Sequence, residues 1–203
     1  MNNHETYSTI VVPIRIIGDI SLRLAEIAIK EGEKASCYDA LDIRKYTFFI
    51  NGTLSLELFF KSFSAKRKHH PSHFNIIKNE NLSQISEDEY NNTNIPAISF
   101  LHSKIEIPKK LQSHDLEKLF LSIPEKHRKE FLKHVYEKSR KIKNEEHFMK
   151  YISSIKNYFI KKRYPFEHFQ LGSPEDSSKI NDLISILKGL IAFIKENPDN
   201  RTN

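Results

Sequence analysis

The stretch from Tyr38 to Phe63, YDALDIRKYTFFINGTLSLELFFKSF, most constrains what this chain can fold into. Its apolar residues fall on more than one face of a helix, as expected for a helix that other helices surround. A strand at YTFFI is an alternative, but the unbroken Leu, Glu, Phe and Lys pattern after it favours a helix. Gly52 interrupts the pattern and predicts a bend or the close approach of another helix.

Helical periodicity also covers most of the remaining chain. Asp19 or Ser21 is suited to cap a first helix, Ser113 or Asp115 a short one, and Pro124 and Pro174 favour helix starts. We expect these helices over residues 19–35, 116–123, 125–143, 144–162 and 173–196. The sequence therefore predicts an all-α protein built as a helical bundle.

Three segments fall outside the helical pattern. Residues 1–18 are predicted to be irregular, with a β-like piece from Thr9 to Ile17 that Pro13 interrupts. Residues 64–113 are predicted to be a long irregular insertion between the second and third helices, although 97–107 is compatible with a hairpin arm or an extended piece. Residues 197–203 are predicted to fray. We expect one domain over residues 19–196.

Composition narrows the possible environments and partners. Only 5 Gly and 8 Pro among 203 residues argue against a turn-rich all-β chain. The formal charge of +6 favours anionic partners such as RNA. Cys37 is the only cysteine, which rules out an intrachain disulfide and a cysteine-based zinc site within one chain. We find no apolar run long enough to cross a membrane and expect a cytoplasmic protein.

Three segments, in order, resemble motifs of the HEPN-domain family. INGTLSLELFFKSF (50–63) resembles its Glu-Leu-hydrophobic-hydrophobic-Lys helix, and SHDLEKLFLSIPEKHR (113–128) resembles its His-Asp-Leu-x-x-Leu-Phe segment. Arg163 and His168, in KKRYPFEHF, fit the pattern of an Arg followed after about four to six residues by a His. The resemblance covers residues from about 20 to 195, with the insertion outside it.

The resemblance implies a bundle of about four to five helices, usually a homodimer with the Arg and His of both subunits in an interfacial cleft. Many members are metal-independent endoribonucleases of toxin, abortive-infection or RNA-surveillance systems. Others are non-catalytic modules that bind RNA or a partner protein. The expected partners are RNA, a second copy of the chain, and an antitoxin or another regulatory protein such as a nucleotidyltransferase. No cofactor or metal is expected.

The chemistry of RNA cleavage suits the Arg and His of the third segment. Histidine transfers protons near neutral pH, and the guanidinium fork of arginine holds a phosphate while keeping its charge. We therefore predict His168 as general acid or base and Arg163 as phosphate clamp, with Pro165 allowing a turn that brings them together. Lys161 and Lys162 would extend an RNA track, and Tyr164 or Phe166 would stack on a base. The alternative is a basic helix end that offsets the macrodipole.

Four further residues are candidates for supporting roles. Glu57 and Lys61 stand four positions apart among Phe and Leu, so we expect an ion pair, either purely intrahelical or meeting polar groups of a neighbouring helix. His114 and Asp115 could orient a catalytic group, but their place before LEKLF makes helix capping the simpler interpretation.

Two basic clusters complete the candidates. Lys66, Arg67 and Lys68 begin KRKHHPSH, which we interpret as a phosphate-contacting loop or a solvated loop; its cations argue against a metal site at the histidines. Arg128 and His134 repeat the Arg-to-His pattern and serve as a fallback pair, although their helix is predicted to be a solvated basic face.

Overall fold

The computed structural model describes residues 13–35, 42–76, 82–86, 88, 97–156, 158 and 174–197. These residues form two compact units, one from the chain before Lys66 and after Glu106, and one from Lys66 to Glu106. The first unit is a helical bundle, which confirms the helical class expected for the bulk of the chain. The second is a sheet, which corrects the prediction of an irregular insertion.

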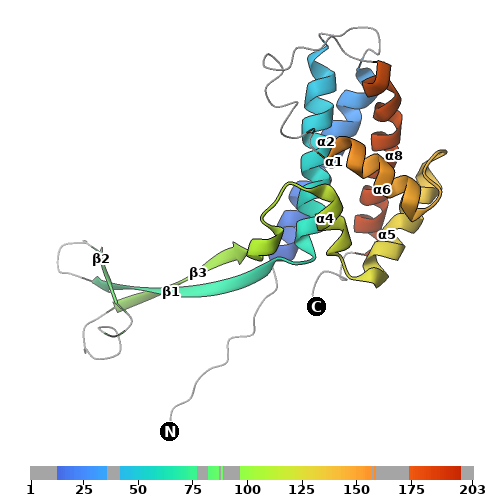
Figure 1. Ribbon diagram of the computed structural model, residues 1–203. Helices are drawn as coiled ribbons and strands as arrows, with labels where there is room; N and C mark the ends of the chain where they lie inside the picture. The colour runs from blue at the N-terminus through green and yellow to red at the C-terminus, as the bar shows by residue number, and fades with distance from the viewer. Residues whose placement is uncertain are drawn as a thin grey trace. The chain divides into compact units, whose positions relative to one another are not determined.

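Three long helices form the body of the bundle. They are α1 (Pro13–Lys34), α2 (Ile43–Ser62) and α8 (Pro174–Glu196), and each contacts the other two (Figure 1). The apolar stretch predicted to be central is indeed a helix, and Asp42 caps its N-terminus through a hydrogen bond from Arg44 N (3.0 Å). The strand alternative at YTFFI is wrong.

Shorter helices pack onto this body. The chain continues through η1 (Lys109–Leu111), α4 (Leu116–Leu121), α5 (Glu125–Lys138) and α6 (Glu145–Ile155). Helix α4 packs on α2 and α6, and α5 packs on α8. Fully buried phenylalanine rings fill the space between them, among them Phe59, Phe60, Phe120, Phe131, Phe148 and Phe193. Phe120 and Phe148 lie with ring centroids 4.7 Å apart, which joins α4 to α6.

The start of α1 differs from the prediction. The helix begins at Pro13, within the segment predicted to be irregular, and both expected caps lie inside it. A proline fits the first turn of a helix, where its missing N–H has no partner to lose. Ser21 is buried instead, and it exchanges hydrogen bonds with Ser55 of α2: each hydroxyl donates to the other residue's carbonyl, at 2.9 and 2.8 Å.

Two glycines set how closely helices approach α8. A Cβ on Gly52 would lie 3.0 Å from Leu183 Cδ2, so the predicted close approach at this residue is confirmed. A Cβ on Gly189 would lie 2.8 Å from the Cα of Val135, which belongs to the backbone of α5. Helices α5 and α8 therefore meet at a separation that only glycine permits at this position.

The second unit is a three-stranded antiparallel sheet with strand order β2-β1-β3. Its strands are β1 (Lys66–Ile76), β2 (Leu82–Ile85) and β3 (Ala97–Glu106). Strand β1 pairs with β3 along nearly its whole length but with β2 only from His73 to Ile76. At Pro71, strand β1 is paired with β3 but not with β2. A residue without an N–H is tolerated at such an edge position, because no strand on the β2 side requires a hydrogen bond from it.

Candidate functional site

An ion pair lies on the buried central helix. Lys61 Nζ donates to Glu57 Oε1 at 2.6 Å, and the two side chains are only 10% and 5% exposed. Charges this far from water are costly unless they are paired, so each depends on the other. The ion pair expected from the spacing is confirmed, but it is not purely intrahelical, because Glu57 also contacts a polar side chain from another segment.

A third polar side chain joins this pair from a distant segment. His114, which precedes α4, places Nδ1 2.8 Å from Glu57 Oε2. Because the carboxylate beside Lys61 can only accept, Nδ1 carries the proton and donates it. The ring is half exposed (51%), so it connects a buried charge with solvent. Glu57, Lys61 and His114 are called the Glu57 cluster below.

The neighbouring residues fix the position of His114. Asp115 is the N-cap of α4, and its Oδ1 accepts from the backbone N–H of Glu117 (3.1 Å) and Lys118 (3.3 Å). Ser113 Oγ accepts from the backbone N–H of Asp115 (2.9 Å). Capping is therefore confirmed for Asp115, whereas His114 contacts the ion pair instead.

The predicted reactive residues Arg163 and His168, with Lys161, Lys162 and Tyr164, lie outside the described residues. The chain on both sides of them is anchored. Tyr151 Oη donates to the carbonyl of Lys179 (2.8 Å), and Lys179 Nζ donates to Tyr158 Oη (3.1 Å). The ring of Tyr158 also packs edge-on against Phe49 of α2, with centroids 4.9 Å apart.

A further contact holds the end of α6. Lys156, its C-cap, donates from Nζ to Glu117 Oε2 at 3.0 Å. This hydrogen bond lowers the pKa of Glu117 and raises the pKa of Lys156. Since Glu117 lies in the first turn of α4, the contact ties the segment that carries His114 to the chain leading toward Arg163.

The predicted basic loop at Lys66, Arg67 and Lys68 is strand, not loop. These residues begin β1, where they stand opposite Glu106, Ile105 and Lys104 of β3. The pairing fixes their backbone in an extended conformation, and their side chains lie outside the described part.

The fallback pair does not belong to a solvated face. Arg128 Nε lies 3.0 Å from Glu145 Oε1, which is an ion-pair distance, but the two groups are not aligned for a hydrogen bond. The guanidinium of Arg128 lies over the Phe120 ring, 5.7 Å from its centroid. His134 is buried, with Nε2 3.8 Å from Glu196 Oε2 and its ring against Phe193. Both side chains are part of the packing between helices, which corrects the prediction for this pair.

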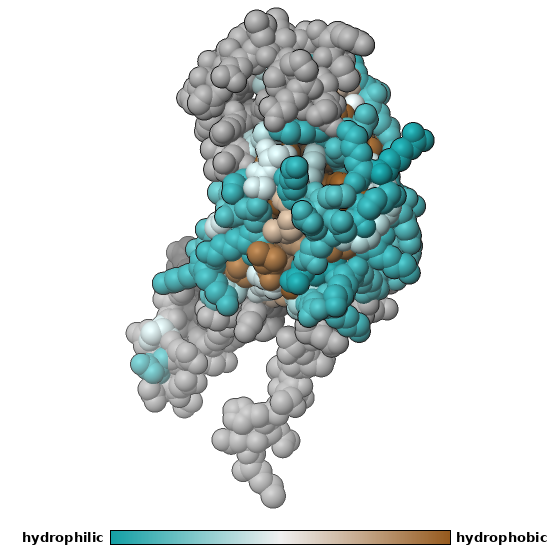
Figure 2. Space-filling view, turned by 45° about the vertical axis from the view of Figure 1, so that its right-hand side comes forward, coloured by the Kyte–Doolittle hydropathy of each residue, from teal (hydrophilic) through white to brown (hydrophobic). Residues whose placement is uncertain are grey.

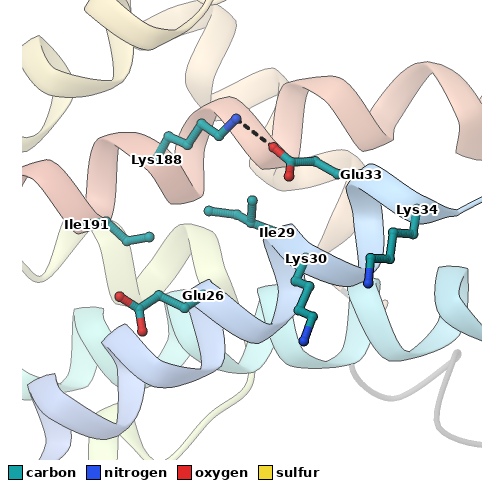
Figure 3. Close-up of a pocket in the computed structure, with 7 residues that line it drawn as sticks. All are labelled: Glu26, Ile29, Lys30, Glu33, Lys34, Lys188 and Ile191. Carbon is teal, nitrogen blue, oxygen red and sulfur yellow. Dashed lines mark hydrogen bonds and ion pairs between the residues drawn. The ribbon is translucent and has the colours of Figure 1, made fainter.

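Pattern reasoning missed two pockets that border α8. The first, of about 330 Å³, lies between α1 and α8; Ile29 and Ile191 point into it, and Lys188 Nζ reaches Glu33 Oε1 across its upper end at 2.8 Å (Figure 3). The second, of about 380 Å³, lies where α5 ends against α8 and is rich in cations. The basic run from Lys138 to Lys143 was a signal for the second pocket, but its partner on α8 is far away in sequence.

Figure 2 shows one face of the molecule, where the coloured side chains are mostly hydrophilic and apolar side chains show in small areas among them. Among the described residues no group of three or more His, Cys, Asp or Glu is placed to hold a metal ion. No described helix has the length and apolar character needed to cross a membrane.

Comparison with known proteins returns no match: no family model fits the chain, and no curated protein or solved structure is significantly similar to it.

Proposed function

We propose that this protein is a metal-independent endoribonuclease of the HEPN type that acts in defence or as a toxin. Arg163 is the phosphate clamp and His168 the general acid or base, and the Glu57 cluster supports the site. The protein acts as a homodimer, because one chain supplies only one such histidine while cleavage uses both an acid and a base.

One observation carries the proposal. Two of the three segments that resemble the family, 50–63 and 113–128, meet where His114 Nδ1 lies 2.8 Å from Glu57 Oε2. Unrelated resemblances far apart in sequence have no reason to converge on one buried charge. Tyr158, the last described residue before the third segment, contacts Phe49 of α2 and Lys179 of α8.

The proposed reaction requires no group beyond these side chains. A base removes the proton of the ribose 2′-OH, the oxygen attacks the adjacent phosphorus, and an acid protonates the departing 5′-oxygen. Arg163 donates two hydrogen bonds to the phosphate oxygens, on which charge accumulates in the transition state. The products are a 2′,3′-cyclic phosphate and a free 5′-hydroxyl.

Expression in a bacterial host tests this function in cells. The wild-type protein should arrest growth, and Arg163→Ala and His168→Ala should each restore it at equal protein levels. Lys126→Ala, at an exposed site on α5, is the matched control and should remain as toxic as the wild type. Arrest of equal strength by all four proteins would refute the assignment of the two reactive residues.

The sheet unit favours a second candidate, a non-catalytic module that binds RNA or a partner protein. Strand β3 is an edge strand of ten residues, and unpaired strand edges accept an additional strand from a partner. This candidate predicts salt-sensitive RNA retention without cleavage. Neutralising Lys66, Arg67 and Lys68 should then weaken retention, whereas neutralising three exposed lysines of the bundle should not.

A further inference from the structure

The pocket where α5 ends against α8 gathers an excess of positive charge. Four cations line it, Lys138, Arg140 and Lys141 from one side and Lys188 from α8. They face a single lining carboxylate, Asp182. The pocket also contains the side-chain amide of Asn181, which offers hydrogen-bond donors, whereas the hydroxyl of Ser185 donates to the backbone carbonyl of Asn181 at 2.9 Å.

The pocket is lined on one side by the end of α5 and the turn after it, and on the other side by α8. Ser139, which is buried, ends α5, and its Oγ accepts from the backbone N–H of Lys141 (3.2 Å) and Ile142 (2.9 Å). Ile142 is buried in the core, so the turn that presents Arg140 and Lys141 is held at both ends. On α8, Asn181, Ser185 and Lys188 recur at helical spacing and form one stripe.

The cations are only partly neutralised by the protein. Lys188 pairs with Glu33 at 2.8 Å, and Lys141 Nζ lies 3.9 Å from Asp182 Oδ2. The side chains of Lys138 and Arg140 have no ion-pair or hydrogen-bond partner in the described part of the chain. Cations at the end of α5 also offset the helix macrodipole, but that effect does not account for Lys188, which lies in the middle of α8.

We infer that this pocket is a phosphate-binding site, which takes either a free nucleotide or the phosphodiester backbone of a polynucleotide. Guanidinium and ammonium groups bind phosphate through charge-assisted hydrogen bonds, and the side-chain amide of Asn181 adds a neutral donor. A volume of about 380 Å³ is within the range of small-molecule sites. The inference concerns binding alone and does not depend on the proposed cleavage.

Titration calorimetry of the full-length protein at fixed ionic strength tests the site, with pyrophosphate, ATP and a short single-stranded RNA as probes. The double variant Lys138→Ala/Arg140→Ala should bind its probe about tenfold more weakly or worse. The matched control Lys126→Ala/Lys150→Ala removes the same charge from exposed positions outside the pocket and should leave the affinity unchanged. Thermal unfolding establishes that each variant is folded.

Two further variants separate a built site from general basicity. Ser185→Phe fills the pocket without changing charge and should abolish the pocket-dependent binding. Asp182→Asn removes the one lining carboxylate at constant shape and should tighten pyrophosphate binding several-fold. Pocket-dependent binding of ATP identifies a nucleotide as the ligand, and pocket-dependent binding of RNA alone identifies a polynucleotide backbone. The site is refuted if no probe binds, if both double variants weaken binding equally, or if Ser185→Phe has no effect.

Discussion

His114 Nδ1 lies 2.8 Å from Glu57 Oε2, although 57 positions separate the two residues in the chain. The contact joins the most buried helix of the bundle to the segment that leads into α4. Lys61 contacts one oxygen of the buried Glu57 carboxylate and His114 contacts the other. A buried carboxylate without such partners would be costly. The following predictions begin from this group.

Replacing Glu57 with Gln should destabilise the protein by about 3 kcal/mol, because it leaves the Lys61 ammonium buried without its counter-charge. Urea unfolding measures the change. The double variant Glu57→Leu/Lys61→Met removes both charges and should recover most of the loss. A Glu57→Gln protein as stable as the wild type would show that the pair is not buried as described.

His114→Ala should cost only about 1 kcal/mol of stability, because the ring is half exposed and one hydrogen bond is lost. Under the proposed function it should nevertheless slow RNA cleavage in protein that is fully folded. Asn144→Ala is the matched control: it removes the N-cap of α6 at a similar cost but leaves the Glu57 contact in place. Equal cleavage by all three proteins would remove His114 from the site.

Gly189→Ala and Gly52→Ala should differ although the chemical change is the same. At Gly189 the new methyl group meets the backbone of Val135 at 2.8 Å, so α5 must move from α8, and we expect a loss of about 3 kcal/mol. At Gly52 the new methyl group meets the side-chain ends of Leu183 and Leu187, which can adjust. The higher helix propensity of Ala stabilises the helix by about 1 kcal/mol and so offsets the cost of this contact. Thermal unfolding of both variants in one buffer makes the comparison, and the reverse order would contradict the described packing.

Asp182 should make stability depend on pH. Burial raises its pKa, although nearby Lys141 acts in the opposite direction. A carboxyl with a raised folded-state pKa binds its proton more tightly when folded, so the folded state gains stability as pH falls through that pKa and loses it as pH rises. Asp182→Asn should therefore raise the melting temperature at pH 7, and the gain should disappear in acid. Asp19→Asn, at an exposed site on α1, controls for the change in charge and should not reproduce this pattern.

The sequence predicted those features that local chemistry determines. The apolar faces of the Tyr38 to Phe63 stretch required a buried helix, Asp115 was suited to cap α4, and Pro124 and Pro174 marked helix starts. Pro13 was misinterpreted because a proline both interrupts a strand and begins a helix. The packing of α1 on α2, which includes the hydrogen bonds between Ser21 and Ser55, lies far away in sequence and was not available to the prediction.

Features that depend on long-range pairing were not predictable in the same way. Strand β1 contains charged residues, histidines and a proline and lacks clear alternation, so its pairing with β3 leaves no local signal. His114 contacts Glu57, and Lys188 lines a pocket with the end of α5, only because of how the helices pack. The spacing of residues within one segment carries no information about such packing.

The nuclease assignment is tested most directly by incubating purified protein with structured and single-stranded RNAs in excess EDTA, beside folded Arg163→Ala and His168→Ala proteins. The account predicts cleavage that leaves 2′,3′-cyclic phosphate ends and that both substitutions abolish. The absence of cleavage of any RNA by the folded wild-type protein, or undiminished cleavage by both variants, would contradict it.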